Sequence, residues 1–347
     1  MDTVRVLTEN HLIMGNKPNF PCQSTYQTQY SGIYSTSENT HAGQRKLLMS
    51  EIYFVTNVHI ERAFANPTLD ADAPFLCIYA GACPCTHLNV LMSMFPNVLF
   101  VLVDPAFSEL KNRVRTKTTY ENRVVIWGEK FSEHIIDIIH AWIGVRNFKQ
   151  GSAQFKSIPD TYFPYFTDLY KLVPFDVELR EDILFISDIR VNARDETAIE
   201  SDMDRQAIWF HQIKASYGLL KFRLPYVTEQ WGSNWRQHGL MRVYLAGDVY
   251  MPIWGPKSTT ECRLFVKRNC DVSTYDPIKH ECNFAGFNQH DRQMPYFYKN
   301  QHFKSFDAAA TEIIKTKYSN YVDTLIPKKH RSHYIDGLQN SKSIEKM

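Results

Sequence analysis

Four ionisable residues stand in apolar stretches of the chain, where a charge needs a partner. Lys46 lies in QRKLL and Lys221 in LLKFR, while Asp188 directly follows ILFIS and Glu261 directly precedes CRLFV. Buried charges are costly unless they are paired, so two lysines and two acids that converge would stabilise one another. A lysine beside a second cation in a partly desolvated site can act as a base near neutral pH. Taken singly, each residue also fits a structural ion pair or a snorkelling side chain.

A strand-to-helix turn, IYAGACPCTH, is a second candidate site. Its small residues would let a cofactor approach the backbone at a helix N-terminus, although Gly81 is its one glycine and G-x-G-x-x-G is absent. Asp104 ends the next apolar run, 23 residues after Gly81. A carboxylate near that spacing binds the hydroxyls of an adenosine ribose. The pair suits a dinucleotide or S-adenosylmethionine, and the structural alternatives are a plain βα turn and a helix N-cap.

Short apolar runs that alternate with helical segments must position these residues. Several runs are apolar on both faces, as strands covered by helices are. Strands are predicted at 75–80, 98–103, 123–127, 183–187, 219–223, 241–245 and 263–266. This alternation predicts an α/β protein with an open sheet, whose ligands bind beyond the carboxyl ends of the strands.

The remaining segments give the domain organisation. Residues 1–40 are predicted to form an irregular N-terminal arm, 41–327 a single large domain, and 328–347 a basic C-terminal tail. One helix is expected from Gln44 to about Thr56, and a late one over 306–322 that Pro327 stops. Residues 133–180 fit no simple βα unit and are interpreted as an insertion.

Composition narrows the class of protein. Hydrophobic residues make up 44% and charged residues 22% of the 347, as in soluble globular proteins. The longest apolar runs fall well short of the ~18 residues of a membrane span, and we expect no signal peptide. The net charge is +2, so a polyanion would have to bind local basic patches. The seven cysteines are expected to be reduced, and no metal site is predicted.

In their order along the chain, Lys46, Asp188, Lys221 and Glu261 match the K-D-K-E tetrad of RNA ribose 2′-O-methyltransferases. The sequence resembles the poxvirus-type cap-specific mRNA (nucleoside-2′-O)-methyltransferase family, which in poxviruses also serves as the poly(A) polymerase regulatory subunit. The resemblance runs from about Gln44 to about Pro327, in the stretches GQRKLL, YAGACPCTH, ISDIR, LKFRLPY and TECRL. It implies a Rossmann-like S-adenosylmethionine-dependent methyltransferase sheet flanked by helices.

The same resemblance implies an enzyme and its residues. A methyl group would pass from S-adenosylmethionine to the ribose 2′-hydroxyl of a cap-proximal nucleotide in N7-methylguanosine-capped mRNA. Lys221 would be the general base, and Lys46, Asp188 and Glu261 would position and tune it. The residues on cofactor-binding positions are Gln44, Tyr79, Gly81, Cys85, Asp104, Phe131 and Ser132. Those on cap-binding positions are Arg223, Leu224, Pro225, Tyr226, Thr228, Thr259, Thr260, Glu261 and Asp276.

The residue types suit that chemistry. A ribose 2′-hydroxyl is a poor nucleophile until a positioned base takes its proton. A methylated guanine is cationic, so it stacks on an aromatic ring such as Tyr226 and pairs with a carboxylate such as Asp276. RNA phosphates would need basic side chains, for which the candidates are Lys111, Arg113, Arg115, Lys117, Arg190, Arg194 and Arg205.

The chain also departs from the family pattern. Cys85 stands where the family has a second glycine, Ala106 where it has an arginine, and Thr228 where it has an acid. A further cap-binding aromatic could be Tyr26, Tyr30 or Tyr34.

Two other functions are weighed. One is a non-catalytic RNA-binding processivity subunit, with a poly(A) polymerase catalytic subunit as its partner. The other is a nicotinamide-dependent oxidoreductase, which would need a glycine-rich turn that the chain lacks. The expected location is the cytoplasm, or the host cytoplasm or virion for a viral protein.

Overall fold

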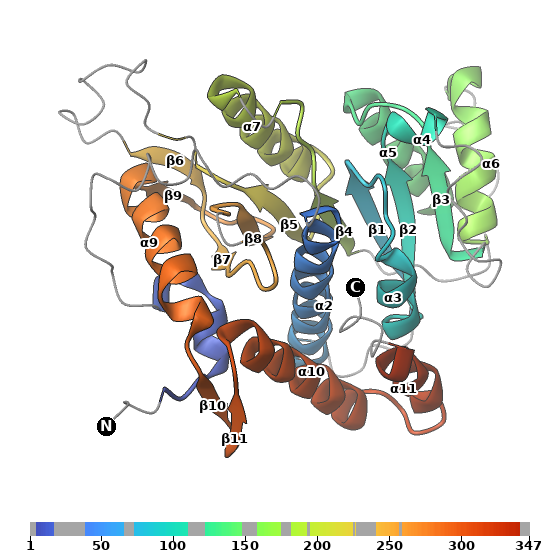
Figure 1. Ribbon diagram of the computed structural model, residues 1–347. Coiled ribbons are helices and arrows are strands. Elements are labelled where there is room, and N and C mark those ends of the chain that lie inside the picture. The colour runs from blue at the N-terminus through green and yellow to red at the C-terminus, as the bar shows by residue number, and fades with distance from the viewer. Residues whose placement is uncertain are drawn as a thin grey trace.

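The computed structural model describes residues 5–16, 39–65, 73–109, 122–147, 158–174, 182–192, 195–224, 226, 241–256 and 259–340. Helices and strands alternate through most of this part (Figure 1). The strands are β1 (Phe75–Ala80), β2 (Val98–Val103), β3 (Val124–Trp127), β4 (Ile183–Ser187), β5 (Tyr217–Phe222), β6 (Arg242–Leu245), β7 (Asp248–Tyr250), β8 (Cys262–Lys267), β9 (Val272–Tyr275), β10 (Tyr296–Tyr298) and β11 (Gln301–Phe303).

The helices differ widely in length. The α-helices are α2 (Asn39–Ala65), α3 (Leu88–Met94), α4 (Ala106–Glu109), α5 (Glu133–Asn147), α6 (Phe163–Leu172), α7 (Glu196–Gln212), α9 (Pro277–Gln289), α10 (Phe306–Leu325) and α11 (Arg331–Asn340). The 3-10 helices are η1 (Glu9–Leu12), η2 (Met14–Asn16), η5 (Asp160–Tyr162) and η7 (Asp291–Gln293).

Seven strands form one sheet in the order β3-β2-β1-β4-β5-β8-β7. The strands from β3 to β5 in this order run parallel, whereas β8 is antiparallel to both β5 and β7. The strands that follow β1 are added first on one side of it (β2, β3) and then on the other (β4, β5), so the strand order reverses between β1 and β4. Open sheets of this kind bind ligands at such a switch point. This architecture is compatible with the predicted Rossmann-like fold, but a sheet order alone identifies no chemistry.

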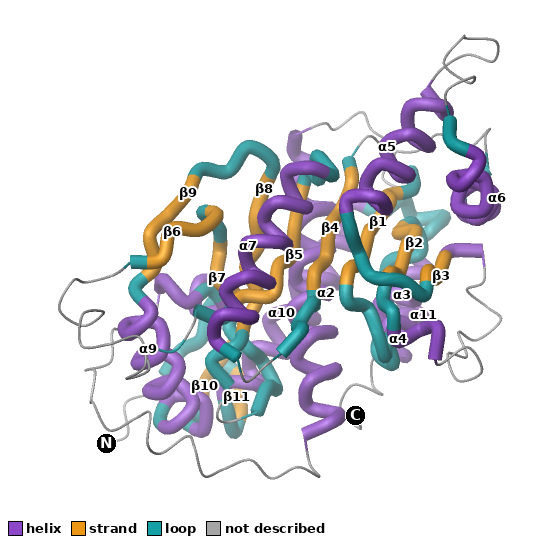
Figure 2. The backbone as a smooth tube through the Cα atoms, turned by 90° about the horizontal axis from the view of Figure 1, so that it is seen from above, coloured by secondary structure: helices purple, strands orange, loops and turns teal. Residues whose placement is uncertain are grey.

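Helices cover both faces of the sheet, which explains why its central strands are apolar on both sides. α2, α3, α10 and α11 pack against one another on one face, and α5, α6 and α7 form the other layer (Figures 1 and 2). Every residue of β1, β2 and β4 is buried. Such strands are found where both faces of a sheet are covered.

Three segments differ from the sequence-based expectations. The strand predicted at 241–245 exists as β6, but it pairs with β9 in a separate two-stranded sheet. Part of the expected insertion, 133–180, is α5, the ordinary helix between β3 and β4. The expected C-terminal tail contains α11, whose Tyr334 is buried and accepts a hydrogen bond at its carbonyl from the Tyr318 hydroxyl.

The cysteines also differ from expectation in one place. Cys77, Cys83, Cys85, Cys262 and Cys270 are free, whereas Cys282 is disulfide-bonded. The expectation of uniformly reduced thiols is therefore wrong at Cys282, because composition does not reveal which thiols approach one another. None of the described helices is long and apolar enough to span a membrane.

Candidate functional site

Six charged side chains meet at the carboxyl edge of the parallel strands, beside the β1–β4 reversal. We call them the edge cluster. Lys46 comes from α2, Asp188 and Arg190 directly follow β4, and Lys221 lies near the end of β5. Glu261 and Arg263 lie at the start of β8, which runs the other way and so begins at this edge. The members are Lys46, Asp188, Arg190, Lys221, Glu261 and Arg263.

The four residues that the sequence singled out lie in contact. Lys46 Nζ is 2.7 Å from Glu261 Oε1. Lys221 Nζ is 2.9 Å from Asp188 Oδ1 and 3.4 Å from Glu261 Oε2. Each lysine is therefore paired with a carboxylate, as two buried amines require.

Arg263 is a member that sequence reasoning missed. In the β5–β8 ladder it stands directly opposite Lys221. Its Nη2 donates to Asp188 Oδ1 at 2.6 Å, and its Nη1 is 3.4 Å from Glu261 Oε1. Like charges directly opposite one another destabilise a ladder, so the two carboxylates offset that repulsion. The sequence signal for this residue was an arginine inside an apolar strand. Its partners could not be predicted, because they depend on the register of β8 against β5.

Arg190 is the least satisfied member of the edge cluster. Its Nη2 lies 3.8 Å from Glu261 Oε2, which is beyond hydrogen-bonding distance. This nitrogen is buried and has no hydrogen-bond partner among the described residues. The cluster holds four cations and two carboxylates, so its formal charge is 4 − 2 = +2.

Burial and neighbouring charges set the protonation of the cluster. Burial alone would raise the pKa of Asp188, but the charges of Lys221 and Arg263 bring it below its ordinary value. The pKa of Glu261 is well below its ordinary value for the same reason, with Lys221 and Lys46 as the main cations. Burial lowers the pKa of Lys46, and Glu261 opposes that change. Both acids are thus held ionised beside a surplus of positive charge.

The turn after β1 is shaped by close backbone packing. Gly81 has φ +74°, and a Cβ there would lie 2.8 Å from backbone atoms of Asp188 and Ile189. The Asp104 carboxylate accepts hydrogen bonds from the backbone N–H of Cys83 at 3.2 Å and of Ala106 at 2.8 Å. Gly81 and Asp104 therefore both have structural roles. The sequence had left such roles open as alternatives to cofactor binding, a plain βα turn for Gly81 and a helix N-cap for Asp104.

The other predicted cofactor residues surround this turn. Tyr79 and Cys85 are buried, and burial holds the pKa of each well above its ordinary value. Phe131 is buried in an aromatic contact with Trp209, with ring centroids 4.9 Å apart. Ser132 precedes α5 and its carbonyl accepts from the N–H of Ile135 at 3.1 Å.

Gln44 belongs to a buried polar chain that sequence reasoning missed. Its Oε1 lies 2.8 Å from Nδ1 of His87, and His87 Nε2 lies 2.8 Å from Glu51 Oε2. The side chains of His87 and Glu51 are almost completely buried. The His87–Glu51 pair connects α2 to the start of α3. Its only signal in the sequence was Glu51, an acid within an apolar helical pattern.

The predicted cap residues lie around Thr260. The Tyr226 hydroxyl is 2.8 Å from Thr260 Oγ1, and the Arg223 guanidinium lies 4.2 Å from the centre of the Tyr226 ring. Arg223 also forms an ion pair with Glu196. Asp276 caps α9 by accepting from the backbone N–H of Ile278 and Lys279.

The remaining predicted residues divide into two groups. Leu224 is buried, the Thr259 hydroxyl accepts from the N–H of Glu261 at 3.1 Å, and Arg205 pairs with Asp202 on α7. Outside the described residues lie Pro225, Thr228, Tyr26, Tyr30, Tyr34, Lys111, Arg113, Arg115, Lys117 and Arg194. Within the described part of the chain, no group of three potential metal ligands is close enough to hold an ion.

Comparison with protein families gives a match to part of the chain. A family model described as the poly(A) polymerase regulatory subunit matches residues 23–114. The part of this range that the structure describes includes α2, β1, α3, β2 and α4. Lys46, Gly81 and Asp104 therefore lie within the matched residues. No curated protein matches the chain.

This match corrects the predicted activity. A family described as a regulatory subunit is typically non-catalytic. The prediction that this protein is an S-adenosylmethionine-dependent mRNA cap 2′-O-methyltransferase is therefore wrong. The order K-D-K-E led to it, because four charged residues that form an ion cluster read in sequence like a catalytic tetrad.

Proposed function

We propose that the protein is a non-catalytic, RNA-binding regulatory subunit of a poly(A) polymerase. The match at residues 23–114 supports the regulatory role. The observation that carries RNA binding is the surplus of positive charge in the edge cluster, at the position where open α/β sheets bind ligands. The protein as a whole is nearly neutral, with a net charge of +2, so such a local surplus is what a polyanion would find.

A phosphate group suits the unsatisfied part of the cluster. The guanidinium of Arg190 has a planar set of donors that matches two phosphate oxygens. Burial lowers the pKa of Arg190, and the nearby charges of Arg223 and Arg263 lower it further against the effect of Glu261. A bound phosphate would give Nη2 an acceptor and offset the crowding of cations.

Binding of labelled single-stranded RNA, followed by fluorescence anisotropy at several salt concentrations, tests this function. We expect Arg190→Gln to weaken binding by about tenfold, since a charge-assisted hydrogen bond contributes roughly 1.5 kcal/mol. The slope of log K against log salt should fall by about 0.7, the value for one phosphate of a single strand.

Arg331→Gln is the matched control. Arg331 lies on α11, away from the edge cluster, and donates to the carbonyl of Ile326. It should leave both the affinity and the salt slope unchanged. Equal RNA binding by the wild type and Arg190→Gln, with equal slopes, would contradict RNA binding at the edge cluster.

The partner in this proposal is the catalytic subunit of a poly(A) polymerase. The regulatory subunit would hold the RNA while the catalytic subunit extends it. Adding the protein to that subunit should lengthen the tails made per binding event, and the tail-length distribution on a gel measures this. Capped mRNA is a natural RNA for the same complex.

Ligand binding near the turn is a separate proposal that involves no reaction. We propose that S-adenosylmethionine contacts the turn after β1, at Gly81, and the Asp104 carboxylate at the end of β2. We also propose that an N7-methylated cap contacts Tyr226. The Asp104 carboxylate accepts two backbone hydrogen bonds, which leaves lone pairs for ribose hydroxyls. Calorimetric titration of each ligand into the protein is the direct measurement.

A further inference from the structure

A pocket of about 310 Å³ lies at the end of α7, beside the turn that follows β8. Its volume is at the lower end of the range for small-ligand sites. Phe210 and Ala215 are buried and supply apolar surface, whereas the other lining residues are exposed. The pocket is lined by Phe210, His211, Lys214, Ala215, Arg268 and Asn269. None of these six was singled out from the sequence.

The pocket and the edge cluster lie at opposite ends of the same pair of strands. Lys221 of the edge cluster is near the carboxyl end of β5. Lys214 lies just before β5, and Arg268 directly follows β8, which is antiparallel to β5. The six residues of β5 cover roughly 20 Å. The pocket is therefore a separate site and not an extension of the edge cluster.

The charged residues that line the pocket are all basic. With His211 neutral, Lys214 and Arg268 give it a formal charge of +2, and no acid lines it. Neither of these two side chains forms an ion pair within the part of the chain that the structure describes. The neighbouring Lys267, in contrast, pairs with Glu61 at 2.8 Å. An anion is therefore the ligand that this pocket attracts.

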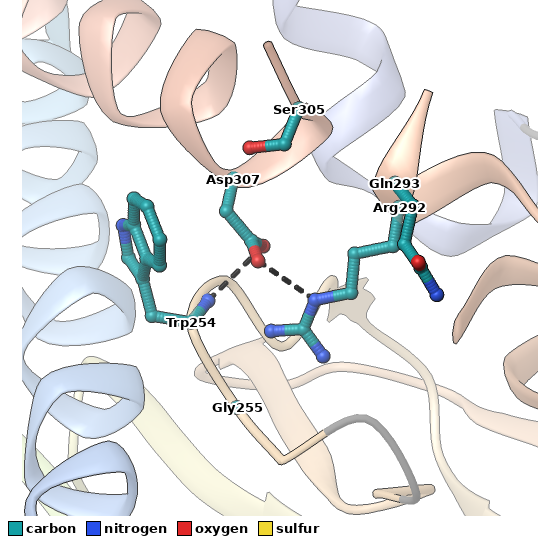
Figure 3. Close-up of a pocket in the computed structure, with 6 residues that line it drawn as sticks. All are labelled: Trp254, Gly255, Arg292, Gln293, Ser305 and Asp307. Atoms are coloured by element: carbon teal, nitrogen blue, oxygen red, sulfur yellow. Dashed lines mark hydrogen bonds and ion pairs between the residues drawn. The ribbon is translucent and has the colours of Figure 1, made fainter. Parts of the chain in front are cut away.

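A larger pocket, of about 410 Å³, lies near the start of α10 and differs in this respect (Figure 3). Its two charged lining residues, Arg292 and Asp307, pair with each other, at 2.7 Å from Nε to Oδ2. Asp307 also accepts from the N–H of Trp254, and Arg292 donates to the carbonyl of Pro252. These charges cancel and are satisfied by the protein, so they give an anion no net attraction.

Arg268 is held in place by the segment that joins α7 to β5. Its Nη2 and Nε donate to the carbonyls of Lys214 and Ala215, and its backbone N–H donates to the carbonyl of Ser216 at 2.8 Å. Its Nη1 makes no hydrogen bond to any described residue. A guanidinium fixed in this way loses little freedom when its remaining donors bind a phosphate oxygen.

Lys214 is not needed to cap α7. A lysine at a helix C-terminus often donates to the last carbonyls. Here the carbonyl of His211 accepts from the N–H of Lys214 at 3.0 Å, and the carbonyl of Gln212 accepts from the His140 ring at 2.7 Å. The ammonium group of Lys214 is therefore available to a ligand.

We propose that this pocket binds a phosphate group, held by the Lys214 ammonium and the Nη1 side of the Arg268 guanidinium. The chemistry of the site depends on the pocket alone. The inference rests on the proposed function only for the source of the phosphate, which is the backbone of the RNA strand that the edge cluster binds. Such a strand would be held at both ends of β5.

A titration with inorganic phosphate tests the pocket without RNA. The readout is the backbone amide signal of Asn269 in NMR spectra of the full-length protein, with sodium chloride at equal ionic strength as the reference. We expect a saturable shift that is specific to phosphate. Lys214→Gln should weaken phosphate binding about tenfold, as expected for one lost charge-assisted hydrogen bond. Lys214→Arg, which keeps the charge, should retain most of it.

Lys267→Gln is the matched control. It removes the same charge next to Arg268, but from a side chain that pairs with Glu61 on α2. Its phosphate affinity should equal that of the wild type. A shift that chloride reproduces, or a phosphate affinity that Lys214→Gln leaves intact, overturns the site.

RNA binding by the same variants identifies the source of the phosphate. A salt slope for long single-stranded RNA that Lys214→Gln lowers by about 0.7, with about fivefold weaker binding near about 0.1 M salt, supports the RNA backbone as the source. An unchanged slope with intact phosphate binding supports the same pocket as a site for a free phosphate-bearing molecule.

The two proposals fail in different ways. Phosphate binding in the pocket, together with RNA binding that Arg190→Gln leaves unchanged, keeps the pocket and contradicts RNA binding at the edge cluster. RNA binding that Arg190→Gln weakens, without a phosphate-specific shift at Asn269, keeps the proposed function and overturns the pocket.

Discussion

Glu261 is the residue on which the edge cluster depends most. Its carboxylate contacts Lys46 and Lys221, and it also lies 3.4 Å from Arg263. Its side chain retains 24% of its exposure, whereas that of Lys46 retains 7%. Because the amine is more deeply buried than the acid, removing the acid leaves a buried cation whose remaining contact is a long one, 3.5 Å from Lys46 Nζ to the carbonyl of residue 261.

We expect Glu261→Gln to destabilise the protein by about 3 kcal/mol, since breaking a buried ion pair leaves its partner uncompensated. Glu61→Gln is the matched control, because Glu61 pairs at 2.8 Å with Lys267 and the two side chains retain 35% and 54% of their exposure. That pair should contribute less than about 1 kcal/mol. Urea unfolding of the three proteins gives the comparison, and similar losses in both variants would refute the role given to Glu261.

At the scale of elements, the turn after β1 and the chain leaving β4 are built against each other. The N–H of Asp188 donates to the carbonyl of Ala80 at 2.9 Å, and Gly81 packs on the following peptide. This contact fixes where Asp188 and Arg190 enter the edge cluster. The shape of the turn after β1 is therefore determined by both β1 and β4 and not by the loop alone.

We expect Gly81→Ala to destabilise the protein by about 2 kcal/mol or more, because it adds both a strained φ and a Cβ clash. Gly144→Ala, in α5 where nothing lies within 4 Å of the new Cβ, should stabilise by about 0.5–1 kcal/mol. Thermal unfolding followed by circular dichroism measures both. A Gly81→Ala protein as stable as the wild type would show that the two strands can separate at no cost.

The hydrophobic pattern correctly predicted the strands that are buried on both faces. The bounds of β1, β2 and β4 agree with the predicted runs, because strands covered on both faces are apolar throughout. β6 was found but assigned to the wrong sheet, since pairing partners depend on tertiary contacts. In the site, unpaired charges in apolar runs pointed to Lys46, Asp188, Lys221 and Glu261. Arg263, Arg292 and Asp307 required register and loop packing, which no local pattern encodes.

At the scale of the whole molecule, pH should act through buried groups rather than through overall charge. The net charge is only +2, so general repulsion changes little near neutrality. His280 is buried among aromatic rings, and burial, with a smaller effect from Arg223, lowers its pKa to about 4. Its ordinary value is 6.5. Between these values the unfolded chain binds a proton that the folded protein rejects, so stability is complete above pH 6.5 and falls as the pH drops toward 4.

We expect this histidine alone to cost about 2 kcal/mol of stability between pH 7 and pH 5. His280→Phe keeps the ring contacts and should remove that part of the pH dependence. The measurement is urea unfolding of both proteins at the two pH values. Parallel losses in wild type and His280→Phe would mean that His280 titrates normally in the folded protein.

The burial of Tyr334 in α11 changes how the basic C-terminal segment can be studied. Lys328, Lys329 and Arg331 invite truncation as a test of whether their charge matters. A chain cut before Lys328, which removes all three charges, would also lose the packing of α11 on α3 and the Tyr334 carbonyl, which accepts from the Tyr318 hydroxyl alongside the Met94 carbonyl. Its phenotype would then mix lost charge with an uncovered hydrophobic surface. Replacing the basic side chains by glutamine, with Tyr334 left in place, separates the two effects.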